Sequence, residues 1–334
     1  MKKINITNQQ QNQRLDKFLL KYFNKASKGF VYKMLRKKRI KYNGKKAEGS
    51  EILKEGDCLQ FYISEETMEG FMEEKSLHKA QRHFAIVYED CDLLVVSKPA
   101  GLLVHPQRAG EKETLIDQIL YYLYEKGEYI ASKENTFTPA ICNRLDRNTS
   151  GIVIAGKNLK TVQAVNEAIA KGKIKKYYMV LVKGIVSKQS EMVSYLQKDA
   201  VRNQVALYQK EAEGRKKIVT KYRPIAQAEG MTLLEVELIT GRSHQIRGQM
   251  QAMGHPVAGD RKYGDSQWNK LFAEKFGLSA QFLHAYGVLW QQTKKDGTVF
   301  TQKQWMAPLP KQLQAIYDFY FKQSNVQHFS VKTK

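Results

Sequence analysis

A carboxylate between two guanidinium groups is the feature of this chain best suited to chemistry. Asp146 lies between Arg144 and Arg147 in the segment ICNRLDRNTSG at residues 141–151. Nearby cations favour the ionised form of a carboxyl group. An ionised carboxylate can act as a nucleophile or as a general base. Structural ion pairs on ordinary surfaces have the same composition, so this segment alone leaves both interpretations open.

Two later segments carry groups that could act together with this carboxylate. The segment KKYYMVLVKG at 175–184 has the pattern of a strand, and its Tyr178 could stack on a base or simply pack in the core. The segment GRSHQIR at 241–247 is predicted to pass from a turn into a helix. Guanidinium and amide donors at such a turn could meet an anion, which makes Arg242 and His244 candidate binding residues.

The composition indicates the class of partner. The chain has 334 residues, with 55 Lys and Arg against 33 Asp and Glu, and its formal net charge is +22. A protein this basic usually binds a polyanion. The three cysteines are widely spaced and form no C-x-x-C pair, which favours a cytoplasmic protein without a structural metal site. No apolar run approaches the ~20 residues of a membrane span, so we expect no membrane partner.

Residues 13–63 predict a small helix-rich nucleic-acid-binding domain. Apolar residues recur at helical spacing over 14–23 and again over 29–40. Asn43–Gly44 then predicts a hairpin turn, and 58–63 predicts a strand. The alternative for so many cations is a solvated basic face without a partner. The candidate RNA-binding residues are Lys33, Arg36, Lys37, Lys38, Arg39, Lys41, Lys45 and Lys46.

The rest of the chain predicts a linker followed by a larger domain. Residues 64–82 are rich in glutamate and poor in branched apolar residues, so we expect an acidic interdomain linker there. Residues 83–322 form the second predicted domain, in which a Gly- and Pro-rich segment at 254–264 is interpreted as a structural loop. An α+β fold with a mixed, mainly antiparallel sheet is expected. The predicted strands cover 84–88, 92–98, 176–184, 219–224 and 231–240, and the predicted helices cover 114–125 and 159–171.

Five ordered motifs carry a family resemblance. They are LLVVSKPAGLLVHP at 93–106, NRLDRNTSGIVI at 143–154, KKYYMVLVKG at 175–184, GRSHQIRGQMQAMGHPVAGDRKYG at 241–264 and LHAYGVLW at 283–290. Over roughly residues 80–310 the chain resembles the RluA-type pseudouridine synthases. Its segment 14–63 looks like the S-four-type RNA-binding module that many of those enzymes carry ahead of the catalytic domain.

The resemblance implies a reaction and a set of residues. A uridine within RNA would be detached from its ribose, turned and rejoined through carbon 5, without a cofactor or metal. Asp146 matches the essential aspartate of the family. Its chemical role stays open among attack on the sugar, attack on the base and removal of a proton. Tyr178 matches the tyrosine that packs on the target base, and Arg247 matches the arginine that pairs with the carboxylate. Ile246 would form an apolar wall to the uracil, and Arg144 would enter the space that the uridine leaves.

This chain departs from the family pattern at two places. Asn143 stands where most relatives have histidine, which is compatible with catalysis if the side chain only orients its neighbours. Gly248–Gln249 replaces a bulkier Val-His pair, which predicts a wider pocket.

Alternatives to this activity and target stay open. We expect a monomer acting on large-subunit ribosomal RNA, with transfer RNA as the alternative substrate. A non-catalytic RNA-binding ribosome assembly factor is the rival function. A DNA-binding regulator would need a recognition helix, and none is apparent.

Overall fold

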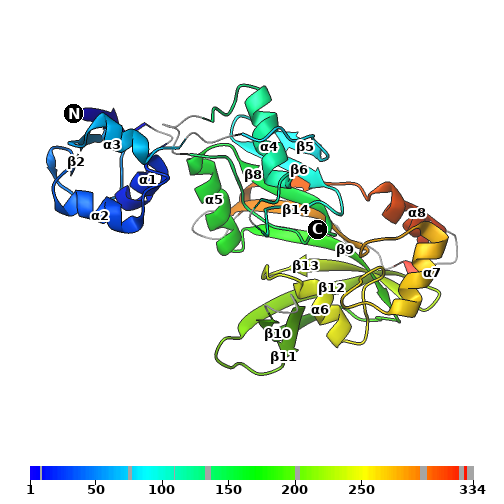
Figure 1. Ribbon diagram of the computed structural model, residues 1–334. Helices are drawn as coiled ribbons and strands as arrows, with labels where there is room; N and C mark the ends of the chain where they lie inside the picture. Colours follow the sequence, from blue (N-terminus) through cyan, green and yellow to red (C-terminus); the bar gives the residue numbers. More distant parts are fainter. Residues whose placement is uncertain are drawn as a thin grey trace.

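The structure, a computed structural model, describes residues 1–7, 10–73, 77–108, 110–131, 137–199, 204–293, 299–322 and 327–328. A small N-terminal domain, drawn in blue in Figure 1, is connected to a larger part built around one long sheet. A hydrogen bond of 2.8 Å from Gln163 Nε2 to the Asn12 carbonyl joins the two parts.

The N-terminal domain packs two helices against a four-stranded antiparallel sheet. The helices are α1 (Leu15–Tyr22) and α2 (Lys28–Arg36). The strand order is β1 (Lys2–Asn5), β4 (Cys58–Phe61), β2 (Ile40–Tyr42) and β3 (Lys45–Lys46). The apolar side chains at helical spacing in α1 are buried, as the periodicity predicts. Asn43 and Gly44 both have positive φ, which is the backbone of the predicted two-residue hairpin turn.

The structure differs from the predicted linker over 64–82. Helix α3 (Glu65–Gly70) begins after Ser64, and it places Met68 in the same apolar core as α1 and α2. The side-chain amide of Asn24 exchanges two hydrogen bonds with the backbone of Glu73, at 2.8 and 2.7 Å. Residues 64–73 therefore pack on the N-terminal domain. Their glutamates suggested a linker, but they occupy the solvent side of an amphipathic turn; Glu74 lies outside the described residues.

The larger part confirms the predicted α+β fold with a mainly antiparallel sheet. Its strand order is β11-β10-β12-β13-β9-β14-β8-β6-β5, and β14 also pairs with β15. Those strands are β5 (Ala85–Glu89), β6 (Leu93–Lys98), β8 (Ser150–Gly156), β9 (Ile174–Lys183), β10 (Ser190–Asp199), β11 (Gln204–Tyr208), β12 (Lys216–Ala228), β13 (Met231–Leu238), β14 (Leu283–Thr293) and β15 (Val299–Met306). Two short strands, β7 (Ala140–Ile141) and β16 (Gln327–His328), pair with β8 and β12.

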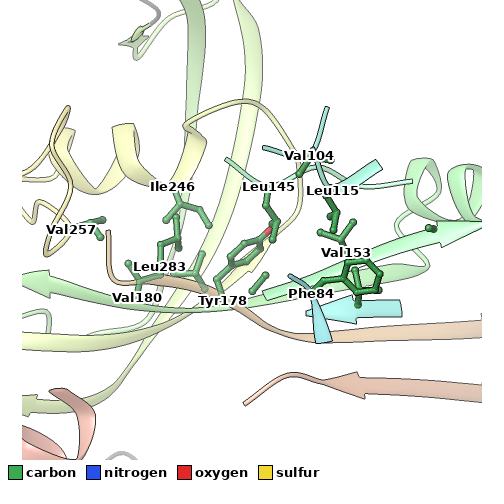
Figure 2. Close-up of a cluster of buried hydrophobic side chains, with 14 of the residues drawn as sticks. Phe84, Val104, Leu115, Leu145, Val153, Tyr178, Val180, Ile246, Val257 and Leu283 are labelled. Atoms are coloured by element: carbon green, nitrogen blue, oxygen red, sulfur yellow. The ribbon is translucent and has the colours of Figure 1, made fainter. Parts of the chain in front are cut away.

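Helices cover the two faces of this sheet and create separate cores. The helices are α4 (Leu115–Glu125), α5 (Leu159–Ala170), α6 (Gln245–Ala252), α7 (Ser266–Phe276) and α8 (Lys311–Phe321). Buried side chains of α4 and α6 join one cluster with β8 and β9, part of which Figure 2 shows. Side chains of α5 join a different cluster with β6 and β8. Among the described helices, none has the length and apolar character that a bilayer crossing requires.

The two halves of the sheet meet where β8 runs parallel to β14. His284 lies opposite Ser150 in that pairing, and Ala285 lies opposite Gly151. Gly151 has φ of +117°, and a Cβ atom there would lie 2.2 Å from the Ala285 carbonyl oxygen. The strands can therefore approach this closely only because residue 151 has no side chain. The junction holds the loop that precedes β8 and contains Asp146.

Candidate active site

Asp146 lies at one end of a chain of charges. Its Oδ2 atom accepts a hydrogen bond of 2.9 Å from Nη1 of Arg247, which comes from α6. The other edge of that guanidinium binds Asp260, with Nε 2.6 Å from Oδ2 and Nη2 2.9 Å from Oδ1. The side chain of Asp260 is fully buried, whereas that of Asp146 is 22% exposed. Buried Asp260 therefore holds the Arg247 guanidinium in place, and the guanidinium in turn holds the partly exposed carboxylate of Asp146.

The pKa shifts of Arg247 and Asp260 favour the ionised forms of both groups. Burial lowers the pKa of Arg247, but the carboxylates of Asp260 and Asp146 outweigh this effect, and the net shift is upward. Burial would raise the pKa of Asp260, but bonds from Arg247 and from the backbone N–H groups of Lys262 and Tyr263 lower it overall. A buried arginine between two carboxylates is compensated in charge and in hydrogen bonding.

A buried lysine anchors the loop that carries Asp146. Nζ of Lys98 donates to the carbonyls of Pro99, Leu102 and Arg147, at 2.8, 2.7 and 2.9 Å. Burial lowers the pKa of Lys98 to about 7, and the charge of Asp146 opposes that shift. Three carbonyl acceptors favour the ammonium form, because a neutral amine has only two N–H groups. Lys98 thus ties the end of β6 to the aspartate loop.

Tyr178 lies close to the carboxylate and is buried, at 4% exposure. In Figure 2 its ring is directed toward Leu145, with Ile246 beside them in the same apolar cluster. Burial raises the pKa of Tyr178, and the negative charge of Asp146 raises it further. The phenol therefore stays protonated at neutral pH and can act as a hydrogen-bond donor.

Asn143 has a structural environment. Its Nδ2 donates to the Ile152 carbonyl at 3.1 Å, and its Oδ1 accepts from the Ile154 N–H at 2.8 Å. The side-chain amide of Asn143 thus uses both its donor and its acceptor on the backbone of β8. These contacts orient the aspartate loop and require no titrating group.

The expected widening of the pocket at Gly248–Gln249 does not occur. A Cβ atom on Gly248 would lie 3.1 Å from a methyl group of Val205, so β11 occupies the space that the smaller residue leaves. Gln249 is fully buried, and its Nε2 donates to Ser194 Oγ of β10 at 2.9 Å. The pair instead provides the surface on which the β10–β11 hairpin packs.

The remaining predicted residues form one group near Asp146 in the sequence or at the start of α6, and a second group in the N-terminal domain. Arg144, Arg147 and Arg242 are exposed, and Arg147 donates through Nε to the Gly101 carbonyl at 3.0 Å. His244 is half-buried at the start of α6. The predicted RNA-binding residues follow the end of α2 through β3, and Lys41 alone among them is half-buried, with the others exposed: Lys33, Arg36, Lys37, Lys38, Arg39, Lys45 and Lys46.

Sequence reasoning missed two parts of the site. Lys98 stands in a quoted motif, and its position directly before Pro99 at the end of an apolar strand was the available signal. Asp260 belongs to the segment interpreted as a structural loop, where an acidic residue directly after Gly259 was the available signal. Within the described ranges, no three or more His, Cys, Asp or Glu side chains are grouped to hold a metal ion.

Comparison with known proteins defines the class of this protein. Residues 92–252 match the family described as RNA pseudouridylate synthase, and residues 13–58 match the S4 domain. An uncharacterized RNA pseudouridine synthase from Aquifex aeolicus is 31% identical over 258 residues, which cover 76% of this chain and 78% of that protein. The chain belongs to the RluA-type RNA pseudouridine synthase family. It is an isomerase with an N-terminal S4 domain, as predicted.

Two further proteins show the extent of the similarity. Ribosomal large subunit pseudouridine synthase C from Vibrio parahaemolyticus is 28% identical over 319 residues, or 94% of each chain. The solved structure of human RNA pseudouridylate synthase domain containing 4 superposes with a TM-score of 0.54 at 20% identity, and the match covers 70% of this chain and 91% of that chain. The latter likeness supports the fold alone.

Proposed function

We propose that this pseudouridine synthase acts through Asp146 on uridines of large-subunit ribosomal RNA. The observation that carries the assignment of Asp146 is its bond to Arg247, whose guanidinium is held from behind by buried Asp260. This arrangement orients the carboxylate while one side stays open to solvent. An ionised, oriented carboxylate suits nucleophilic attack as well as proton removal.

The target uridine must leave the RNA stack before Asp146 can act on its glycosidic bond. Extrusion of a base costs a few kcal/mol, which contacts with the RNA backbone can offset. Leu145, Tyr178 and Ile246 offer an apolar surface beside the carboxylate for the extruded uracil. The protonated Tyr178 would act as a hydrogen-bond donor beside the uracil. Arg144, which is exposed, would occupy the space vacated in the RNA.

The choice of ribosomal RNA rests on the N-terminal domain and on the relatives. The exposed cations from α2 to β3 supply contacts to a phosphate backbone beyond the reacting nucleotide. A relative similar over 94% of both chains is named for the large ribosomal subunit. We also propose that the protein acts as a monomer in the cytoplasm, where its three free cysteines would stay reduced.

Mapping of pseudouridine across total RNA tests this function. Cells lacking the gene are complemented with the wild type or with Asp146→Asn, which keeps the side-chain shape and removes the charge. Sites in large-subunit ribosomal RNA should disappear on deletion and return only with the wild type. Sites confined to transfer RNA would move the substrate to that class. Sites restored by Asp146→Asn would overturn the role of the aspartate, and no lost site in either RNA would favour the non-catalytic assembly factor.

A further inference from the structure

The hydroxyl of Tyr263 lies between two partners near the candidate site. It accepts the N–H of Val205 in β11 at 2.8 Å and lies 3.0 Å from Nδ1 of His244. A hydroxyl group can accept through its oxygen and donate its one proton, so Tyr263 can accept from Val205 and donate to Nδ1 of His244 at the same time. With Nδ1 as the acceptor, the ring proton of a neutral His244 resides on Nε2.

His244 is held in an uncommon backbone conformation. Its φ is +56°, in the left-handed region, which costs a residue with a Cβ atom about 1–2 kcal/mol. The following residue, Gln245, secures the turn, because its Oε1 accepts the Arg242 N–H at 3.1 Å and its Nε2 donates to the Val219 carbonyl at 3.1 Å. Strained residues that their surroundings fix in this way occur often at functional sites.

His244 lies beside the charged groups around Asp146. The centre of its ring is 5.6 Å from that of Tyr263, and the guanidinium carbon of Arg247 lies 5.1 Å from the centre of the same tyrosine ring. Burial lowers the pKa of His244 overall. The charges of Asp146 and Asp260 oppose that shift, whereas Arg247 and Lys262 add to it. His244 is thus a neutral imidazole close to Asp146 at neutral pH.

We propose that His244 is a further substrate-binding residue, whose Nε2–H donates to an oxygen of the target nucleotide beside Asp146, and that Tyr263 is the positioning residue that fixes this tautomer. The inference rests on the proposed function, because it takes the nucleotide at Asp146 as the substrate. Since Nδ1 is bound to Tyr263, Nε2–H is the ring donor left for an external acceptor.

Tyr263 is well placed to hold this tautomer. It is 7% exposed, and its backbone N–H donates to Asp260 Oδ1 at 3.1 Å. The guanidinium carbon of Arg247 lies 5.1 Å from the centre of its ring. The same residue therefore contacts the aspartate that supports Arg247, the histidine at the start of α6 and the β10–β11 hairpin.

Two amide substitutions separate the nitrogen atoms of His244. The amide nitrogen of glutamine takes the place of Nε2, whereas that of asparagine takes the place of Nδ1. Single-turnover rates are measured on an RNA fragment that carries a uridine mapped as above. His244→Gln should stay within about threefold of the wild type, and His244→Asn should lose about tenfold, which corresponds to one hydrogen bond. Equal rates for the two variants would overturn the role of Nε2–H.

The substitution Tyr263→Phe removes only the hydroxyl and keeps the ring under Arg247. It should lower the single-turnover rate about tenfold, close to the His244→Asn effect. Tyr88→Phe is the matched control, because its hydroxyl binds Asp90 at 2.7 Å away from the site, and it should leave the rate unchanged. A Tyr263→Phe rate equal to that of the wild type would remove the positioning role.

Nitrogen-15 spectra of histidine-labelled protein without RNA read the tautomer directly. His244 should carry its proton on Nε2 in the wild type and exchange between tautomers in Tyr263→Phe. A proton on Nδ1 in the wild type would overturn the inference even if the enzyme is active. If the wild type forms no pseudouridine in the rate assay, the proposed function fails, whatever the tautomer.

The acceptor oxygen belongs either to a phosphate or to the nucleoside. An RNA fragment with an uncharged methylphosphonate on the 5′ side of the target uridine distinguishes the two. Loss of the difference between His244→Gln and His244→Asn would assign the phosphate. A difference that persists would assign the base or ribose, and both results support the donor.

Discussion

At the residue scale, the site depends on how one guanidinium is shared. Arg247 is 6% exposed and serves two carboxylates, of which Asp260 is the buried one. Without Asp260, the guanidinium would lose two of its three hydrogen bonds to carboxylates and could turn away from Asp146. The orientation of the proposed reacting group is therefore set by a residue that itself contacts no solvent.

The substitution Asp260→Asn tests this support. It keeps the side-chain shape but leaves the buried guanidinium without its main counter-charge, which should cost about 3–5 kcal/mol of unfolding free energy. Denaturant unfolding at neutral pH measures this cost. The control Glu167→Gln removes a pair with Lys171 in which both side chains are exposed, and it should leave the free energy of unfolding nearly unchanged. Equal costs for the two variants would contradict the support role.

At the element scale, the junction of β8 with β14 holds the aspartate loop in place. The Ser150 hydroxyl lies 2.8 Å from Nδ1 of His284, and Nε2 of His284 lies 3.1 Å from the Ala307 carbonyl. The ring thus donates to a carbonyl on one side and accepts from a hydroxyl on the other. This bridge and the missing side chain of Gly151 fix where the loop ends and β8 begins.

A methyl group at residue 151 should disrupt the junction. Gly151→Ala places Cβ against the Ala285 carbonyl at a positive φ, which should cost about 3 kcal/mol or more and lower turnover by displacing Asp146. Gly172→Ala is the control. It also has a positive φ, but no atom lies within 4 Å of the added Cβ, so its cost should stay near 1 kcal/mol. Thermal unfolding and single-turnover rates of both variants check the difference.

The pH dependence of stability should report the buried His284. Burial lowers the pKa of His284 below its usual 6.5, and bonds to the backbone at 307 and 308 only partly oppose this shift. Because the unfolded chain then binds a proton that the folded chain excludes, stability is full above pH ~6.5 and falls below it, by at most about 1.4 kcal/mol per pH unit. His284→Gln should have a shallower slope between pH 6.5 and 5. Parallel slopes would show that His284 is not buried in its neutral form.

At the scale of the whole molecule, the chain combines a basic N-terminal domain with a site in a larger sheet. The formal charge of +22 favours binding of a polyanion. Contacts with phosphates release counterions, so affinity should fall steeply with salt. We therefore expect the N-terminal cations to set affinity for long RNA and the Asp146 loop to carry the proposed chemistry.

Neutralising three N-terminal cations tests this division. The triple variant Lys37→Gln, Lys38→Gln and Arg39→Gln should bind a long RNA more weakly and reduce the slope of log K against log salt by about 0.7–0.9 for each lost phosphate contact. Its single-turnover rate at saturating RNA should stay close to that of the wild type.

An equal change of charge elsewhere provides the control. Lys270→Gln, Lys311→Gln and Lys322→Gln lie on or next to α7 and α8. That triple variant should leave the salt slope nearly unchanged. Equal slopes for the two triple variants would mean that net charge, and not the N-terminal surface, controls binding.

The sequence by itself determined the local elements and the chemical class. Helical spacing in α1, the Asn43–Gly44 turn and the strand pattern of β9 depend on interactions between near neighbours, so they could be predicted. The five motifs identified the family because their order is itself a sequence property.

The family resemblance already implied that Arg247 pairs with Asp146, 101 positions away in the chain. Only the tertiary structure decided what supports that pair, because Asp260 binds the same guanidinium from a segment that sequence patterns mark as a loop. Lys98 anchors the aspartate loop because its ammonium group reaches the carbonyl of Arg147. Gly248 leaves room for a methyl group of Val205 in β11. Contacts between distant segments depend on how the strands and helices assemble around the whole sheet, and no local sequence pattern encodes them.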